Sequence, residues 1–311
     1  MHFLLVSDWH HRTIRTLARR AHASRSELPW RVACPICDDS GWKTIEANGV
    51  ARVTRCDCIR EKTVELRLRD ARIPPRYQRC TLDNFLPYPN EELLRAIDTA
   101  KRFSDTFPAV QKGLMLIGPP GIGKTHIAVS VLRNAIARTG ARGLYYDTRA
   151  LLKDIRSTYN PLTHTAEMDV IRPVMEAEIV VLDDLGAERL TDWVEETMSL
   201  IVNTRYNEKR PTIFTSNYED IPEEGEINSL IARVGFRLHS RLKEMCEFLE
   251  YDGPDYRAQP PNIGADDLHK LWKAQPRRKL PSRSQGQVRA QIKTPKHEKV
   301  DLKWSGGRAG S

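Results

Sequence analysis

A glycine-rich segment that ends in a lysine and a threonine is the strongest chemical signal in the chain. Residues 118–125 fit the phosphate-loop pattern G-x4-G-K-[ST]. In such a loop the backbone N–H groups surround the phosphates, the lysine reaches the β- and γ-phosphates, and the threonine hydroxyl ligates Mg²⁺. With the adjoining histidine, the nucleotide-binding residues are expected to be Gly118, Pro119, Pro120, Gly121, Ile122, Gly123, Lys124, Thr125 and His126.

Two neighbouring carboxylates supply the second half of a nucleotide site. Asp183 and Asp184 follow the apolar run 179–182, and such a run followed by acids is often only a strand that leaves the core. Its occurrence together with a phosphate loop favours a functional interpretation. Asp183 is then expected to hold Mg²⁺ with Thr125, and Asp184 to orient or deprotonate the attacking water.

Further polar residues extend the predicted site. Asn217 follows the apolar run 212–215 and could sense the γ-phosphate, although asparagine also favours turns for backbone reasons. Arg237 and Arg241 are four residues apart on an expected helix and therefore share a face. Helical arginines are commonly solvated surface residues, but their position after the Asn217 run favours an arginine that stabilises the transition state.

Four cysteines near the N-terminus have metal-ligand spacing. Cys34 and Cys37 form a C-x2-C pair, and Cys56 and Cys58 form a C-x-C pair after a gap of 18 residues. Four thiolates can close a tetrahedral Zn²⁺ site, and its role would be structural because no coordination position stays open. An iron–sulfur cluster is the alternative. The two remaining cysteines are expected to be packing residues; they are Cys80 and Cys246.

The elements that position these residues follow a regular alternation. Four short apolar runs, at 114–117, 143–146, 179–182 and 212–215, have the character of buried parallel strands. Helical patterns occupy 126–139, 149–159 and 191–207. Strand–helix alternation predicts a three-layer α/β domain with a parallel sheet. A further helix is expected at 59–71, ended by two prolines.

The chain has 311 residues and a net charge of +8. Residues 1–32 carry +4 and residues 276–311 carry +8, so the part between them is acidic, at −4. The basic tail could add salt-sensitive affinity for DNA, or it could only aid solubility. No apolar run approaches the roughly 18–20 residues that span a membrane, and we expect a cytoplasmic protein.

This organisation suggests four parts. They are a basic extension at 1–32, a cysteine-bearing segment with a linker helix at 33–75, a nucleotide-binding core at 76–257, and a basic tail at 258–311 that is expected to be disordered. The sequence does not support a GTPase, since no Asn-Lys-x-Asp sequence, the usual guanine-recognition motif, follows the phosphate loop. ABC-type ATPases are excluded by the absence of Leu-Ser-Gly-Gly-Gln.

Together these motifs resemble the DnaC/DnaI-type replicative helicase loaders and the related IstB transposition helpers, within the AAA+ ATPases. The resemblance covers roughly residues 34–257 and is specific as a set. It is carried by the segments 73–77, 81–85, 118–126, 182–188, 210–217, 240–242 and 253–257. One departure from AAA+ proteins at large is Asp184, where a glutamate is usual, but the loader group shares it.

The resemblance assigns roles to several residues. Arg241 matches the arginine finger that reaches a neighbouring subunit's nucleotide, and Arg237 lies one turn before it. Arg257 matches a second arginine sensor. The insertion at 151–175 resembles a helical element that contacts single-stranded DNA, with Lys153 and Arg156 as candidate contacts.

The resemblance thus implies an ATP-dependent loader that places a replicative helicase on single-stranded DNA in a bacterial or phage-infected cell. Its ATPase would be slow and stimulated by DNA or partner, its subunits would associate through their ATP sites, and its zinc-bearing segment would hold the helicase. One alternative is an IstB-like transposition helper. The cysteine-bearing segment favours the loader over this helper. The other is a zinc-containing nucleic-acid adaptor that binds ATP without hydrolysis.

Overall fold

The computed structural model describes residues 34–47, 50–160, 166–220, 229–259 and 264–274. The basic extension 1–32 and the charged residues 276–311 lie outside the described residues, so the structure does not test the predictions made for them. No helix within the described ranges is long and apolar enough to cross a membrane.

A five-stranded parallel sheet forms the centre of the molecule, in the order β4-β5-β6-β3-β7. Its strands are β3 (Gly113–Ile117), β4 (Gly143–Asp147), β5 (Ile179–Asp183), β6 (Thr212–Ser216) and β7 (Cys246–Glu250). Every residue of β3, β5 and β6 is buried, as expected for parallel strands covered on both faces. The four predicted strands are present, and β7 is an additional edge strand.

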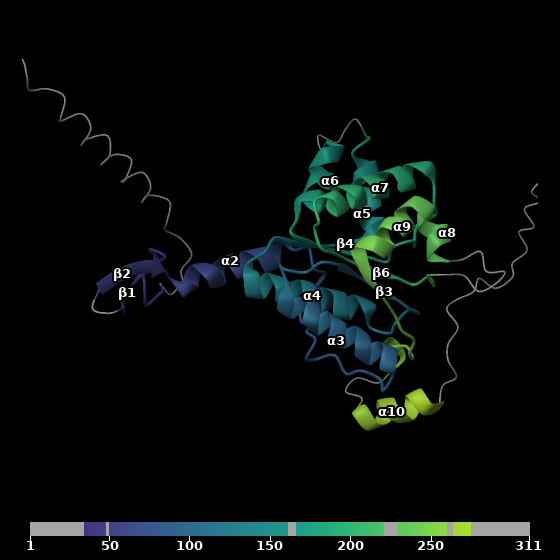
Figure 1. Cartoon of the computed structure of the whole chain (residues 1–311), viewed down its shortest axis with the longest axis horizontal. Helices are drawn as coiled ribbons and strands as arrows, with labels where there is room; N and C mark the ends of the chain where they lie inside the picture. The colour runs from purple at the N-terminus through teal and green to yellow at the C-terminus, as the bar shows by residue number, and fades with distance from the viewer. Residues whose placement is uncertain (1–33, 48–49, 161–165, 221–228, 260–263, 275–311) are drawn as a thin grey trace, which may run out of the picture.

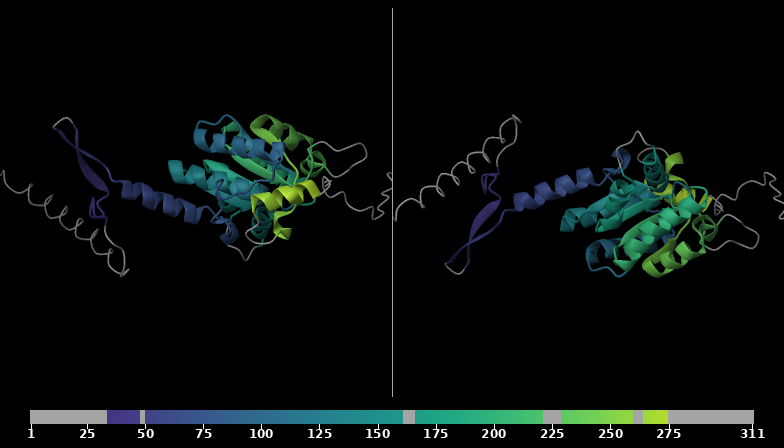
Figure 2. Two further views of the ribbon diagram at one scale, coloured as in Figure 1. Left: turned by 90° about the horizontal axis from the view of Figure 1, so that it is seen from below. Right: turned by 90° about the horizontal axis from the view of Figure 1, so that it is seen from above.

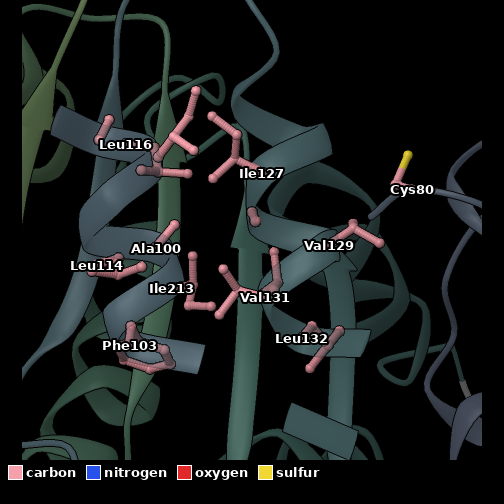
Figure 3. Close-up of a cluster of buried hydrophobic side chains, with 14 of the residues drawn as sticks. Cys80, Ala100, Phe103, Leu114, Leu116, Ile127, Val129, Val131, Leu132 and Ile213 are labelled. Carbon is pink, nitrogen blue, oxygen red and sulfur yellow. The ribbon is translucent and has the colours of Figure 1, made fainter. Parts of the chain in front are cut away.

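Helices cover both faces of the sheet (Figure 1). On one face lie α3 (Glu91–Thr106) and α4 (Lys124–Thr139), whose apolar side chains pack on β3 and β6 (Figure 3). The other face carries α5 (Thr148–Ser157), α6 (Glu167–Glu176), α7 (Asp192–Asn207), α8 (Leu230–Val234) and α9 (Phe236–Met245). The predicted three-layer α/β architecture is therefore confirmed.

An N-terminal module projects from this core. The hairpin of β1 (Trp42–Ala47) and β2 (Val50–Arg55) lies at the far end of α2 (Asp57–Asp70) in all three views (Figures 1 and 2). No residue of α2 is buried. The chain joins the core immediately afterwards, because Ala71 and Ile73 are buried and Tyr145 of β4 donates its backbone N–H to the Ala71 carbonyl at 2.8 Å.

The short helices η1 (Pro75–Tyr77) and η2 (Tyr256–Ala258) flank the core domain in sequence. One further helix, α10 (Ala265–Ala274), falls inside the segment expected to be disordered. Its Leu268 is 1% exposed within the apolar cluster, and the Trp272 ring centroid lies 6.3 Å from that of Tyr88. These apolar contacts give residues 265–274 a packed face, so the expectation of disorder does not hold there.

Candidate nucleotide and metal sites

The phosphate loop joins β3 to α4 in a conformation that requires glycine. Gly121 and Gly123 have φ values of 86° and 96°, in the left-handed region that side chains disfavour. A Cβ on Gly121 would lie 1.8 Å from Oδ1 of Asp255, and one on Gly123 would lie 2.4 Å from the Phe85 ring. The glycines therefore serve both the turn and the close approach of flanking segments.

Lys124, the first residue of α4, is only 5% exposed. Its ammonium donates to the carbonyls of Gly118 and Pro119 at 2.7 and 2.8 Å and to Oδ1 of Asn217 at 2.7 Å. Burial lowers its pKa to about 8, against the opposing field of Asp184 and Asp183. The ammonium thus lies on the loop, where phosphate oxygens can take over hydrogen bonds that carbonyls now accept.

Asp183 ends β5 and is 6% exposed. Its carboxylate accepts hydrogen bonds from the hydroxyls of Thr125 at 3.0 and 3.1 Å, Thr215 at 2.6 Å and Tyr145 at 2.7 Å. Burial raises its pKa, and the hydroxyl donors oppose that shift. Hard oxygens from Thr125 and Asp183 beside a phosphate loop are the donor set that Mg²⁺ prefers, so these residues fit the ion.

Asp184 begins the loop after β5 with a φ of 58°. Its backbone N–H donates to the Thr215 hydroxyl at 2.9 Å, and its Oδ1 accepts from Nδ2 of Asn217 at 2.7 Å. The Arg149 guanidinium lies 3.8 Å from its Oδ2. Asn217 therefore bridges Lys124 and Asp184 at the end of β6.

A cavity of about 690 Å³ opens over these residues. Segment 74–86 and Tyr256 line it opposite the phosphate loop, and Arg257 and Leu268 also contribute. Ile122 is buried in the apolar core instead and is absent from the described lining. Arg237 and Arg241 of α9 are absent from the described lining.

His126 lines the cavity but makes contacts of another kind. Its Nε2 lies 2.9 Å from the Thr81 carbonyl and 3.0 Å from Oδ1 of Asn84, and its ring centroid is 5.1 Å from that of Phe85. Burial lowers its pKa. The histidine thus joins segment 81–85 to α4 through hydrogen bonds and ring contact. These contacts bring segment 81–85 to the phosphate loop, although the two are distant in sequence.

Several residues of this site were not anticipated. Arg76, Tyr77 and Phe85 line the cavity, whereas the sequence connects their segments only with a family resemblance. Tyr145 and Arg149 contact the two aspartates. Nothing in their local sequence signals these contacts, because each depends on strands that meet only in the folded sheet.

The four N-terminal cysteines converge as their spacing suggested. Their sulfur atoms all lie within 4.8 Å of one another, with Cys34 to Cys56 at 3.8 Å and Cys37 to Cys58 at 3.3 Å. Zinc–sulfur bonds of about 2.3 Å in a tetrahedron place the sulfurs about 3.8 Å apart. The cluster therefore fits a four-coordinate metal.

The other two cysteines are separate from this cluster. Cys80 and Cys246 are buried, and burial raises the pKa of both thiols. Both belong to apolar clusters, in agreement with the packing role expected for them, but Cys80 also lines the nucleotide cavity.

The chain is similar to bacterial proteins over part of its length. YqaM of Bacillus subtilis, an uncharacterised protein, is 24% identical over 208 residues, 64% of this chain and 64% of that protein. The replicative helicase loader DnaC of Escherichia coli is 23% identical over 151 residues, 48% of this chain and 60% of that protein. The aligned regions thus span less than two thirds of either relative.

A solved structure and a family model extend the comparison. The crystal structure of the DnaC helicase loader is 33% identical, covers 57% of this chain and 99% of its own, and superposes with a TM-score of 0.50. The sequence model of the family described as IstB-like ATP binding protein matches residues 61–260. That match begins within α2 and includes the whole sheet and η2, and the chain belongs to this IstB/DnaC family.

Proposed function

We propose that the protein is an ATP-dependent loader of a replicative DNA helicase onto single-stranded DNA. The match to the DnaC helicase loader structure, over 99% of that chain, carries the proposal. It is supported by the assembly of Lys124, Asp183, Asp184 and Asn217 around one cavity.

The proposed chemistry is ATP hydrolysis to ADP and phosphate. The loop N–H groups and Lys124 would bind the phosphates, and Thr125 and Asp183 would hold Mg²⁺, which neutralises phosphate charge when bound. Asp184 is positioned by Asn217 to orient the attacking water. Arg257 lines the same cavity and could sense the nucleotide, whereas Arg237 and Arg241 would act on a neighbouring subunit.

A basic hollow on α5 and α7 supports the proposed contact with single-stranded DNA. Arg149, Lys153 and Arg156 line a cavity of about 310 Å³ together with Trp193, and Glu188 adds one carboxylate to the lining. The Arg156 guanidinium lies 4.6 Å from the centroid of the Trp193 ring. Cations beside an aromatic side chain are the combination that binds phosphates and bases of single strands.

The projecting hairpin supports a partner-binding role for the N-terminal module. Its register pairs Trp42 with Arg55 and Thr44 with Val53, which puts Trp42 and Val53 on one face. Their exposed fractions are 53% and 68%. Apolar side chains on one exposed face of the hairpin favour a protein partner. We assign the replicative helicase to this face and zinc to the four cysteines of the module.

The family description favours a second candidate, an IstB-like transposition helper. Affinity capture from host extract with the full chain separates the two: we expect the replicative helicase, and capture of a transposase instead would support the helper. Cys56→Ser serves as the control that should lose the helicase. ATP turnover is a second test. We expect single-stranded DNA to stimulate it, whereas ATP binding without turnover would support the zinc-containing nucleic-acid adaptor.

A further inference from the structure

Tyr145 occupies a position in the site that no motif predicts. It is the third residue of β4, its side chain is 6% exposed, and its hydroxyl donates to Oδ2 of Asp183 at 2.7 Å. In the sheet register Tyr145 pairs with Val181, two residues before Asp183 on β5. Because residues two apart on a strand share a face, the register itself directs the tyrosine hydroxyl towards the carboxylate.

The other donors to this carboxylate have additional partners or tasks. Thr215 also accepts the backbone N–H of Asp184 at 2.9 Å. The Thr125 hydroxyl is the one expected to ligate Mg²⁺. The Tyr145 hydroxyl, which the metal site does not claim as a ligand, donates to Oδ2 of Asp183.

The tyrosine itself is firmly held. Its backbone N–H donates to the Ala71 carbonyl at 2.8 Å, where the linker after α2 lies beside β4. Its ring centroid lies 6.5 Å from that of Tyr77, which lines the nucleotide cavity. The backbone hydrogen bond and the neighbouring Tyr77 ring both restrict Tyr145, so its hydroxyl can keep one direction.

We propose that Tyr145 is a positioning residue that orients the Asp183 carboxylate for Mg²⁺. The proposal rests on the nucleotide site of the proposed function and deepens it. Partners of metal ligands fix the direction of the ligand atoms, and their loss commonly weakens metal binding by about 10-fold or more. Tyr145, which also lines the nucleotide cavity, would thereby set the Mg²⁺ concentration at which nucleotide is bound.

Replacement of Tyr145 by phenylalanine in the full chain provides the test. A fluorescent ATP analogue is held at fixed concentration while Mg²⁺ is raised, and the Mg²⁺ concentration for half-maximal binding is measured. We expect Tyr145→Phe to raise it about 10-fold, while analogue affinity in EDTA and the thermal unfolding midpoint stay close to wild type.

The adjacent tyrosine offers a matched control. Tyr146 is equally buried but packs in the cluster on the opposite face, and its hydroxyl has no hydrogen-bond partner within the described ranges. Tyr146→Phe should leave the Mg²⁺ dependence unchanged.

Three results would overturn the proposal. The first is a Tyr145→Phe protein with the wild-type Mg²⁺ dependence, and the second is an equal loss of affinity in EDTA, which would indicate a purely structural role. The third is a wild-type protein that binds no analogue at any Mg²⁺ concentration. That result alone would also reject the proposed function.

Discussion

At the residue scale, the most deeply buried charge in the described structure lies outside the nucleotide site. Arg205 of α7 is 0% exposed. Its guanidinium donates to the carbonyls of Val174, Ala177 and Pro211 at 2.7–2.8 Å and to the Thr212 hydroxyl at 2.8 Å. Burial lowers its pKa to about 9. The arginine thus satisfies backbone carbonyls at the end of α6 and joins that end to the start of β6.

We therefore predict that Arg205→Met destabilises the core by about 3 kcal/mol, because several buried carbonyls lose their donors. Denaturant unfolding of the full chain measures the change. Arg172→Met is the control, since Arg172 is exposed on α6 and should shift the free energy of unfolding by less than about 0.5 kcal/mol. Equal effects of the two substitutions would show that the buried contacts contribute little.

Arg205 also illustrates which residues the sequence can reveal. The phosphate loop and the two aspartates were predictable because their function depends on neighbours in sequence, as at 118–125 and 183–184. Arg205 and Tyr145 make their contacts across strands and helices that are distant in sequence. A lone arginine or tyrosine has no local pattern, so only the folded sheet discloses its role.

At the element scale, the β1–β2 hairpin has little to stabilise it besides the cysteines. An isolated two-stranded sheet is at best marginally stable in water. Most of the described hairpin side chains are exposed, including Trp42, Ile45 and Val53. Cys56 lies between β2 and α2 and Cys58 in the first turn of α2, so a bound metal would tie the hairpin to the helix.

We expect one tightly bound Zn²⁺ per chain and its loss in Cys56→Ser, because a thiolate ligand is removed. Elemental analysis of the purified protein measures the metal. Helicase binding should fall far more than affinity for ATP, since the cysteines and the phosphate loop lie in separate parts of the structure. Cys80→Ala should keep its zinc. Full zinc content in Cys56→Ser, or iron and sulfide in the wild type, would contradict the assignment.

Two elements show where sequence patterns were insufficient. Strand β7 mixes buried, half-buried and exposed positions and pairs with β3 at the sheet edge, so it lacks the continuous apolar run of the predicted strands. Helix α10 contributes Leu268 and Trp272, four residues apart, to the apolar cluster. With Leu271 they form a single i, i+3, i+4 set in a charged segment, and their packing becomes visible only against Tyr88.

At the scale of the whole molecule, the arginines of α9 are separate from the cavity of their own chain. Arg241 donates to the Arg237 carbonyl at 3.2 Å, and the adjacent Phe236 is 75% exposed. The described lining of the nucleotide cavity contains neither arginine. An exposed aromatic residue beside two arginines is a suitable surface for a second copy of the chain. We propose that catalysis is shared between subunits, which agrees with this separation and can be tested directly.

Phosphoryl transfer spreads negative charge over the γ-phosphate oxygens, and an arginine there is worth roughly 10³–10⁵ in rate where one is used. Arg241→Ala should therefore bind ATP normally but lose hydrolysis. Asp184→Asn should also bind ATP and lose hydrolysis, but through its own site, while the asparagine oxygen can still accept a hydrogen bond from Asn217.

In mixtures, an intact Arg241 on an Asp184→Asn subunit can meet an intact Asp184 on an Arg241→Ala neighbour. We expect such mixtures, measured with single-stranded DNA or helicase present, to regain ATPase activity above the sum of the two separate proteins. If Arg241 acts within its own subunit or is only a surface residue, no mixing ratio recovers activity, and assembly through shared ATP sites must be abandoned.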